Sequence, residues 1–344
     1  MNPIDLRSDT LTQPTSEMRE AMARAKVGDD VFQEDPTLRQ LEETAAEKLG
    51  KEAALFVPSG TMGNLVCVLT HCRRGDEAIL GDRSHIFLNE AGGISALGGV
   101  HPHILPNAED GTLPLDSVEK AVRPVDIHYP PSRLLCLENT HNYCMGSPLS
   151  PEYMEQAADL AHRYSLRIHL DGARIFNAAA ALGVDVKRLA RHADSVMFSL
   201  SKGLSAPVGS LICGSGGFIQ KARKMRKMVG GGMRQAGHLA ATGLVALEHL
   251  AGRLQEDHDH AKKLAEGLSS IPGIELNAER VQTNIVFFGL NHPRVENEIF
   301  LQHLESEGIK ILMIDPGTFR AVLHREISGE DVSRVIQVVR AFLS

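Results

Sequence analysis

From residue 53 onward, short apolar runs alternate with longer segments in which apolar residues recur at helical spacing. Runs that are apolar, often β-branched and bounded by polar residues or glycine are typical of buried strands. Helices are expected between most of them, including Ser150–Tyr164 and Phe218–Met228. This alternation favours a mostly parallel sheet covered by helices on both faces, so we predict an α/β fold with a seven-stranded sheet. The expected strands are Ala53–Val57, Glu77–Leu80, His103–Leu105, Arg133–Leu137, Arg167–Leu170, Ser195–Leu200 and Gly209–Cys213.

The segment before the first of these strands predicts two helices. One is expected near Ser16–Ala25, after a short extended stretch that could clasp a neighbouring subunit as an N-terminal arm. The next begins at Pro36, where Thr37 and Gln40 match a capping box. Gly50 ends it, because glycine readily takes the left-handed conformation that follows a helix. Its apolar stripe consists of Leu38, Leu41, Ala45 and Leu49.

The C-terminal part of the chain changes character. Residues from Gly237 to about Gly267 have a nearly uninterrupted helical pattern and are expected to bridge two domains. After them come strand-like runs and two more helices, which predict a small α+β unit. We therefore divide the chain into a large domain, residues 1–250 with the N-terminal arm, and a small domain, residues 251–344. The expected elements are Asn284–Phe288, Ile311–Ile314, Phe319–Leu323, Val295–Glu307 and Gly329–Leu343.

Composition narrows the class of protein. The chain has 344 residues, a formal net charge of −7 and a pI near 6.1, so electrostatics give no reason to expect a nucleic-acid or anionic-membrane partner. The first residues are charged where a signal peptide needs an apolar run, and no stretch has the apolar length of a membrane-spanning helix. Five cysteines without a Cys-x-x-Cys pair indicate neither a disulfide framework nor a zinc site. These features predict a cytoplasmic enzyme, and we assign no residue to a metal site.

Lys202 lies where the strand Ser195–Leu200 runs out into a loop broken by glycine and proline. A lone lysine in a polar loop is usually a solvated surface charge. Here, however, Asp171 ends another apolar strand 31 residues earlier. Ligands bind at the carboxyl ends of strands in open α/β sheets, so the amine and the carboxylate are expected at one site. Asp171 could instead cap the helix that follows it.

Ser59, Gly60 and Thr61 follow the strand Ala53–Val57 and open a helix. Free amide groups at a helix N-terminus, with hydroxyls beside them, favour a bound phosphate, although Ser-Gly-Thr alone is more often a plain cap. A lysine that can form a Schiff base, a carboxylate that keeps a pyridinium nitrogen protonated and a phosphate cradle are together what pyridoxal phosphate chemistry requires. The three stretches therefore predict that cofactor.

Histidines and arginines supply further candidates. His85 and His141 each follow a strand end, where an imidazole could move protons near neutral pH. His169 lies inside a strand, two residues before Asp171, and is expected either to pack in the core or to support the site residues. Arg174 could pair with Asp171, or it could bind the cofactor or a substrate carboxylate. Arginine suits that last task because its planar fork binds a carboxylate through two hydrogen bonds.

Several longer motifs resemble the low-specificity L-threonine aldolases, which belong to the β-eliminating lyase group of fold-type-I pyridoxal phosphate enzymes. The resemblance runs from about residue 4 to the last helix. One departure is that Phe32 and Gln33 stand where the family usually has Tyr-Gly, which removes a phenol. The motifs are Ile4–Thr10, Gly28–Val31, Glu34–Thr37, Leu137–His141, His169–Arg174, Ser201–Gly203, Pro207–Gly209 and Gly230–Gln235.

The resemblance implies a fold-type-I architecture and a role for each candidate residue. Lys202 carries the cofactor, His85 stacks on its ring, and His85 or His141 is the base, directly or through a water. The residues implied in catalysis are Lys202, His85, His141 and Asp171. Those implied in cofactor binding are Lys202, Ser59, Gly60, Thr61, His85, Asp171, Arg174 and Ser201. Those implied in substrate binding are Ser8, Arg174, Arg320, Lys227 and Arg234.

The reaction that follows from this resemblance is reversible retro-aldol cleavage of threonine, allo-threonine and related β-hydroxy-α-amino acids to glycine and an aldehyde. Another pyridoxal phosphate lyase, or an aminotransferase acting on a small amino acid, is the alternative. A non-catalytic protein that kept the fold is disfavoured, because the lysine, the carboxylate and the phosphate loop are all intact. Lys227 and Arg234 flank a glycine-rich loop and are expected to act across a subunit interface, in a homotetramer built as a dimer of dimers.

Overall fold

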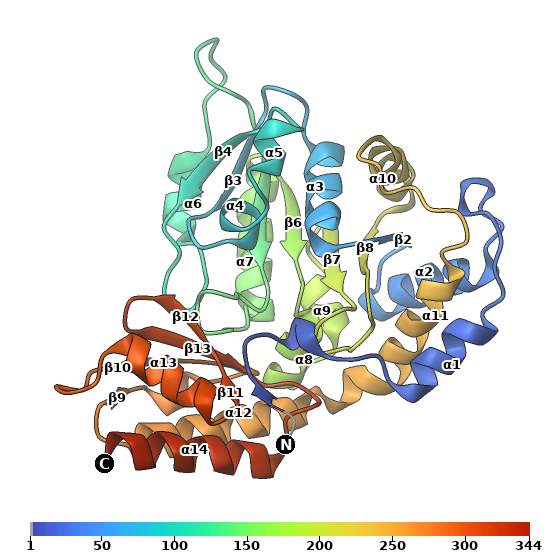
Figure 1. Cartoon of the computed structure of the whole chain (residues 1–344). Helices are drawn as coiled ribbons and strands as arrows, with labels where there is room; N and C mark the ends of the chain where they lie inside the picture. The colour runs from blue at the N-terminus through green and yellow to red at the C-terminus, as the bar shows by residue number, and fades with distance from the viewer. Residues whose placement is uncertain (1–2) are drawn as a thin grey trace.

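A seven-stranded sheet forms the centre of the molecule (Figure 1). The computed structural model describes residues 3–344; Met1 and Asn2, at the start of the predicted arm, lie outside this range. Neighbouring strands are parallel from β4 to β7, whereas β8 pairs antiparallel with both β7 and β2. The predicted mostly parallel sheet is therefore confirmed. In spatial order the strands are β2 (Ala53–Val57), β8 (Ser210–Gly214), β7 (Ser195–Ser199), β6 (Arg167–Asp171), β5 (Ser132–Glu138), β3 (Glu77–Gly81) and β4 (His101–Leu105).

Alternate residues of each strand pack against opposite helical layers. In β5, Leu135 and Leu137 join the cluster formed with α2, α7, α8, α9 and α11, whereas Leu134 and Cys136 pack with α3 and α5. At the other end of the sheet, α3 and α10 cover the same face as α5. Both faces are thus dry, as the continuous apolar character of the strands predicts. The helices are α2 (Pro36–Leu49), α3 (Gly60–His71), α4 (His85–Leu88), α5 (Gly93–Ala96), α6 (Leu115–Ala121), α7 (Pro151–Arg163), α8 (Ile175–Leu182), α9 (Val186–Ala190), α10 (Gly216–Met228) and α11 (Gly237–Val245).

A second, smaller sheet is antiparallel and has its own apolar cluster. Its strands follow the order β12-β13-β10-β9, and α12, α13 and α14 pack with them. The predicted small α+β unit is present, but its division from the rest at residue 250 stays a prediction. The elements are β9 (Ile274–Glu275), β10 (Ile285–Leu290), β12 (Leu312–Asp315), β13 (Thr318–Val322), α12 (Leu254–Ser269), α13 (Asn297–Ser306) and α14 (Gly329–Leu343).

The N-terminal segment joins this smaller unit within the same chain. β1 (Ile4–Asp5) pairs in parallel with β11 (Ile309–Lys310), and Ile4 and Leu6 lie in the smaller apolar cluster. The segment then crosses to the large unit, where α1 (Ser16–Arg24) packs on α11. In the described part of the chain, residues 4–6 are therefore held by the chain's own small unit.

Two local expectations differ from the structure. Asp35, not Thr37, caps α2: its carboxylate accepts a hydrogen bond from the backbone N–H of Leu38, and the Thr37 hydroxyl donates to the carbonyl of Lys26. An aspartate directly before Pro36 is an equally good cap, because the proline occupies the first helical position. The bridging helix is also interrupted: a π turn at residues 246–250 and a 3₁₀ turn at residues 251–253 separate α11 from α12.

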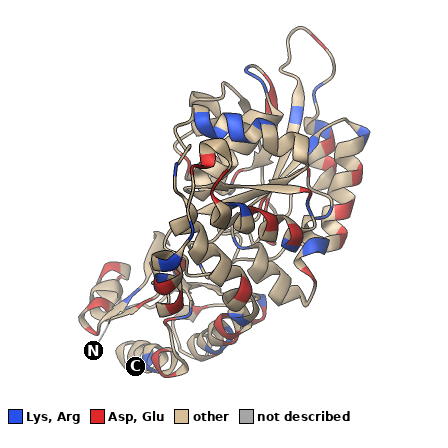
Figure 2. Cartoon of the chain, turned by 90° about the vertical axis from the view of Figure 1, so that its right-hand side faces the viewer, with Lys and Arg blue, Asp and Glu red and all other residues tan. Residues whose placement is uncertain are grey.

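The exterior is polar and mixed in charge (Figure 2), with Lys and Arg interspersed with Asp and Glu over the outer helices. All five cysteines are free and buried, as expected for small apolar core residues. Among residues 3–344, no helix combines the length and the hydropathy needed to cross a bilayer.

Candidate active site

A cavity of about 210 Å³ lies at the carboxyl ends of β5, β6 and β7. The N-terminal segment, the loops after these strands and one residue of β13 contribute its walls. The sheet geometry thus brings together residues that are far apart in sequence, as the rule for open α/β sheets predicts. Its lining residues are Ser8, Thr10, His85, Asn89, Glu138, Asn142, Tyr143, Asp171, Ala173, Arg174, Lys202 and Arg320.

Lys202 enters the cavity from the loop after β7. The N-terminal segment fixes its backbone, because the Thr12 hydroxyl donates to the Lys202 carbonyl at 2.9 Å. Burial lowers the pKa of the amine, the neighbouring Arg174 lowers it further, and Asp9 opposes both effects. A lowered pKa favours the unprotonated amine, which is the nucleophilic form.

Asp171 ends β6 and is 2% exposed. Its Oδ1 accepts a hydrogen bond from the backbone N–H of Ala173 at 3.0 Å, and its Oδ2 accepts one from Asn64 Nδ2 at 2.8 Å. The carboxylate therefore caps the turn that follows and also lines the cavity. Asp171 therefore caps the turn before α8 and not the helix itself, and its role at the ring nitrogen stays a prediction.

His85 is the first residue of α4, and two buried glutamates hold it in place. Its backbone N–H donates to Glu138 Oε2 at 2.7 Å, and its Nδ1 lies 2.8 Å from Glu90 Oε1. The hydrogen bond to Glu90 raises the pKa of the imidazole, against the effect of burial. Because Nδ1 is engaged with Glu90, Nε2 is the nitrogen left for proton transfer.

Two guanidinium groups converge on one side of the cavity. Arg174 forms a buried two-bond pair with Asp9, at 2.8 and 2.7 Å, and does not pair with Asp171. Arg174 Nη1 and Arg320 Nη1 both donate to Asn142 Oδ1, at 3.3 and 3.1 Å. Arg320 is 7% exposed and its Nε has no hydrogen-bond partner among the described residues. A pair of buried cations with donors unused, the Arg320 Nε among them, is suited to a carboxylate ligand.

The predicted phosphate cradle has the geometry of a helix N-terminus. Ser59 caps α3 by accepting from the Met62 N–H, and Ser59 and Thr61 are both exposed. Behind Gly60 lies the hydroxyl of Ser210, a buried donor without a partner in the described chain. That oxygen is 3.6 Å from the position a Cβ would take on Gly60, and Met197 is closer still. Ser201 directly precedes Lys202, and its hydroxyl forms a hydrogen bond with the Ser199 hydroxyl.

These observations fit pyridoxal phosphate. The orphaned Ser210 hydroxyl and the free amides of the α3 N-terminus offer donors to a phosphate. The buried Asp171 carboxylate matches the ring nitrogen, and Lys202 provides the amine. No other group in the described cavity is needed for the fit.

Seven predicted residues are not among those that line the cavity. They are Ser59, Gly60, Thr61, Ser201, His141, Lys227 and Arg234. His141 is 1% exposed, its ring packs beside Gly111, and neither ring nitrogen has a hydrogen-bond partner among residues 3–344. Lys227 and Arg234 are exposed, and Arg234 pairs with Asp29 at 3.0 Å. Their roles stay predictions, and in the described chain neither residue lines the cavity that contains Lys202.

The segment that departs from the family pattern, Phe32–Gln33, lies at the surface. Phe32 is 68% exposed and Gln33 has φ 57°. That left-handed conformation favours glycine, which is the residue the family usually carries there. Neither side chain lines the cavity.

Sequence reasoning missed several lining or supporting residues. Glu138 ends β5, and Asn142 and Tyr143 lie in the loop after it, so the strand-end rule that selected His141 could have selected them. Asn64 and Glu90 carried no such signal, because one is an interior helical residue and the other a loop residue before α5.

Comparisons with known proteins agree with this geometry. The beta-eliminating lyase family profile matches residues 5–290. The chain is 52% identical to low-specificity L-threonine aldolase 1 of Arabidopsis thaliana, over 96% of this chain and 94% of that protein. It is 45% identical to the Escherichia coli K12 low specificity L-threonine aldolase, over 99% of both chains. The solved Leishmania major threonine aldolase shares the fold, with a TM-score of 0.86 at 21% identity, covering 99% of this chain and 100% of that one. The chain therefore belongs to the low-specificity L-threonine aldolases, within the beta-eliminating lyase family.

Proposed function

We propose that this enzyme cleaves threonine and related β-hydroxy-α-amino acids to glycine and an aldehyde, with pyridoxal phosphate as cofactor. The observation that carries the proposal is one cavity that joins the partly buried Lys202 amine, a buried carboxylate and a pair of buried arginines. Family membership narrows the bond that is broken to Cα–Cβ.

Different residues of the chain would hold different parts of the cofactor. Ser59, Gly60, Thr61 and Ser201 would hold the phosphate, Asp171 the ring nitrogen and Lys202 the reactive carbon of the cofactor. When bound, pyridoxal phosphate withdraws the electron pair released as the Cα–Cβ bond breaks.

The substrate carboxylate would bind to Arg320 and Arg174. Arg320 has the unused Nε donor, and the pair with Asp9 keeps Arg174 in a fixed orientation. Ser8 lines the same wall, although its hydroxyl already accepts from Thr10. Holding the carboxylate fixes which bond at Cα stands where cleavage is assisted, so binding contributes to the rate as well as to affinity.

His85 would take the proton of the β-hydroxyl at Nε2. Glu90 supports this role, because its hydrogen bond to Nδ1 raises the pKa of the imidazole and fixes the ring. His141 lies outside the cavity lining, so the geometry favours His85 as the base.

The experiment is product analysis with threonine, allo-threonine and phenylserine assayed side by side. Release of glycine and the matching aldehyde, dependent on added pyridoxal phosphate, is the expected result. Pyruvate or ammonia from serine, or amino transfer to a keto acid, in place of glycine release would replace the proposal with its lyase or aminotransferase alternative.

We also propose that Arg234 or Lys227 completes the site of a neighbouring subunit in a dimer, itself doubled to a tetramer. Gly231 supports this arrangement, because a Cβ there would lie 2.1 Å from Met62 Sδ, which places the glycine-rich loop against the first turn of α3. Both cations are exposed beside that loop. The location of the protein in the cytoplasm stays a prediction.

Mixing two inactive proteins tests the shared site. Hybrids of a Lys202→Ala subunit with an Arg234→Ala subunit should recover activity, because one of their two sites carries both intact residues. Proven hybrids without recovery would place Arg234 in its own subunit's site or outside catalysis.

A further inference from the structure

Asn64, in the second turn of α3, joins the two carboxylates behind the cavity. It is fully buried, and its Nδ2 donates to Asp171 Oδ2 and to Glu90 Oε1, at 2.8 Å each. Glu90 Oε1 is the same oxygen that meets His85 Nδ1. One side-chain amide thus touches both the carboxylate predicted for the ring nitrogen and the carboxylate that holds the base.

The opposite end of the Asn64 side chain fixes its orientation. Asn64 Oδ1 lies 3.0 Å from His169 Nε2, and His169 Nδ1 lies 3.0 Å from the Ser195 hydroxyl. Because Asn64 Nδ2 must donate to two carboxylates, Oδ1 is the acceptor and His169 carries its proton on Nε2. His169 Nδ1 then accepts from Ser195. Each hydrogen bond has one direction, so the amide cannot flip without breaking all three of its contacts.

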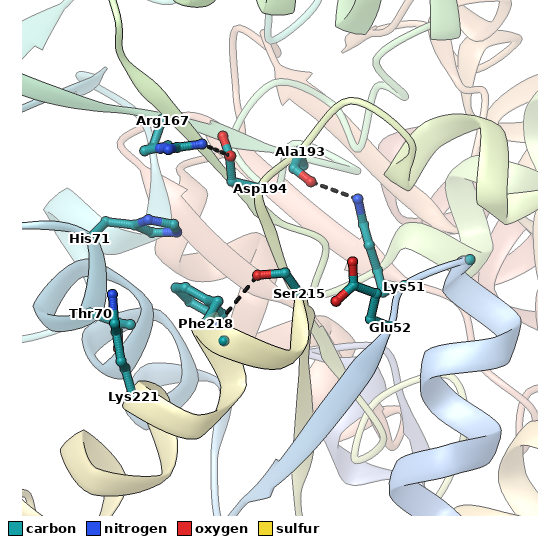
Figure 3. Close-up of a pocket in the computed structure, with 13 residues that line it drawn as sticks. Lys51, Glu52, Thr70, His71, Arg167, Ala193, Asp194, Ser215, Phe218 and Lys221 are labelled. Atoms are coloured by element: carbon teal, nitrogen blue, oxygen red, sulfur yellow. Dashed lines mark hydrogen bonds and ion pairs between the residues drawn. The ribbon is translucent and has the colours of Figure 1, made fainter.

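This polar chain continues along the face of the sheet that α3 covers, toward the opposite end of the strands. Ser195 Oγ lies 2.8 Å from His71 Nε2, at the C-terminal end of α3, and His71 stacks on Phe218. Figure 3 shows His71 in the wall of a second cavity, beside Phe218 and opposite Arg167. Burial lowers the pKa of His169 to about 4 and that of His71 to about 3, so both rings are neutral at pH 7.

We propose that Asn64 is the positioning residue that holds Asp171 and Glu90 in one arrangement, with His169, Ser195 and His71 fixing the direction of its amide. The proposal rests on the proposed function, because it assigns Asp171 to the cofactor ring and His85 to the substrate. It extends that function, because it makes both halves of the site depend on one side chain.

Electrostatics explain why an amide is required here. Two buried carboxylates close together repel, and in this site burial raises the pKa of Glu90, with the charge of Asp171 adding to that effect. The amide offers its two donors to the pair without adding a charge. Without them, one carboxylate would take up a proton or turn away, and either change would reach His85 or the ring nitrogen.

The test compares Asn64→Asp with a matched control, Asn177→Asp, in the holoenzyme. Asn177 in α8 is also a buried asparagine bonded to a histidine, His258 at 3.1 Å, but within residues 3–344 it forms no hydrogen bond with a carboxylate. For both variants we would measure kcat and KM for threonine, the affinity for added pyridoxal phosphate, and the pH dependence of the visible absorption band of the bound cofactor.

For Asn64→Asp we expect kcat to fall about 100-fold, since two charge-assisted hydrogen bonds are lost at about tenfold each. Cofactor affinity should fall less than about tenfold, because the phosphate cradle is intact. The absorption band should titrate at a different pH. In the control, Asn177→Asp, the absorption band should titrate at the same pH as in the wild-type enzyme. Equal behaviour of the two variants, or a kcat loss that only follows cofactor occupancy, would overturn the proposal.

Asn64→Ser decides the matter if the aspartate variant does not fold. A hydroxyl can donate one hydrogen bond, so the expected loss in kcat is about tenfold. The absorption band should again titrate at a pH different from that of the wild-type enzyme. An unchanged kcat, together with an unchanged titration of the absorption band, would refute the proposal. If the wild-type enzyme cleaves no β-hydroxy-amino acid, the proposed function fails, yet the band's titration still reports whether Asn64 positions Asp171.

Discussion

Two cavities lie at opposite ends of the same strands, and the smaller one is the candidate active site. β6 begins with Arg167 at an outer cavity of about 680 Å³ and ends with Asp171 at the inner cavity of about 210 Å³. Likewise, Asp194 precedes β7 in the outer cavity, and Lys202 follows it in the inner one. The outer cavity (Figure 3) is the larger by volume, so size alone would select the wrong end of the sheet.

The difference lies in what surrounds the charges. In the outer cavity, Arg167 pairs with Asp194 while 65% of its side chain is exposed. In the inner cavity, the side chains of Arg174 and Asp9 are 5% and 0% exposed. Exposed pairs are screened by water and contribute little, whereas buried charges act strongly on each other and on a ligand. Desolvated charge, rather than volume, distinguishes the candidate active site.

The strongest test of this comparison removes one partly buried lysine from each cavity. Lys202→Ala should abolish turnover together with the covalent attachment of the cofactor and its yellow colour. Lys51→Ala is the control, because burial lowers the pKa of that amine too, but it donates to the carbonyls of Ala193 and Arg191. It should lower stability and leave kcat intact. A yellow, fully active Lys202→Ala enzyme would refute the assignment.

The next largest effect is expected at Asp171, the last residue of β6. Asp171→Asn should lower kcat by about 10²–10³-fold, as expected when a preorganised electrostatic partner is removed. Cofactor affinity should change much less, since the phosphate is held elsewhere. If the rate falls only in proportion to cofactor occupancy, Asp171 is merely structural.

A third comparison measures how much the Arg174–Asp9 and Arg167–Asp194 ion pairs each contribute to the free energy of unfolding. Asp9→Asn leaves Arg174 buried without its charge partner, so the free energy of unfolding should fall by about 3–5 kcal/mol. Arg167→Ala in the outer cavity should cost less than about 1 kcal/mol. Denaturant titration of both variants measures the difference, and equal losses would contradict it.

The same pair predicts a pH dependence. Arg174 holds the pKa of Asp9 at about 2, below the ordinary 3.8. The contribution of Asp9 is therefore fully present above pH 3.8 and is lost as the pH falls through 2, amounting to about 2 kcal/mol. In Asp9→Asn this acid-dependent loss should be absent.

How far the sequence could predict the molecule depends on the kind of signal. The strands were predicted within a few residues, since their apolar runs are buried on both faces. Lys202, Asp171, His85 and Arg320 were predicted from strand ends or resemblance, and the structure brings them to one cavity. Asn64 and Asp9 could not be found, because a partner 107 or 165 residues away leaves no local pattern. His141 shows the converse: it follows a strand end, yet its ring lies outside the cavity.

The smallest expected effect tests the outer end of the buried chain. The folded-state pKa of His71 lies at about 3, below the 6.5 of an ordinary histidine, because of burial. As the pH falls from 6.5 toward 3, the unfolded chain takes up a proton at this position that the folded chain does not, so the free energy of unfolding decreases. His71→Gln removes that uptake. Its stability should therefore fall less steeply with acid, by up to about 1 kcal/mol per pH unit, allowing for the partial exposure of the ring. Urea titrations at pH 6.5, 5.5 and 4.5 measure the two slopes, and identical slopes would mean that His71 accepts a proton in the folded protein as readily as in the unfolded one.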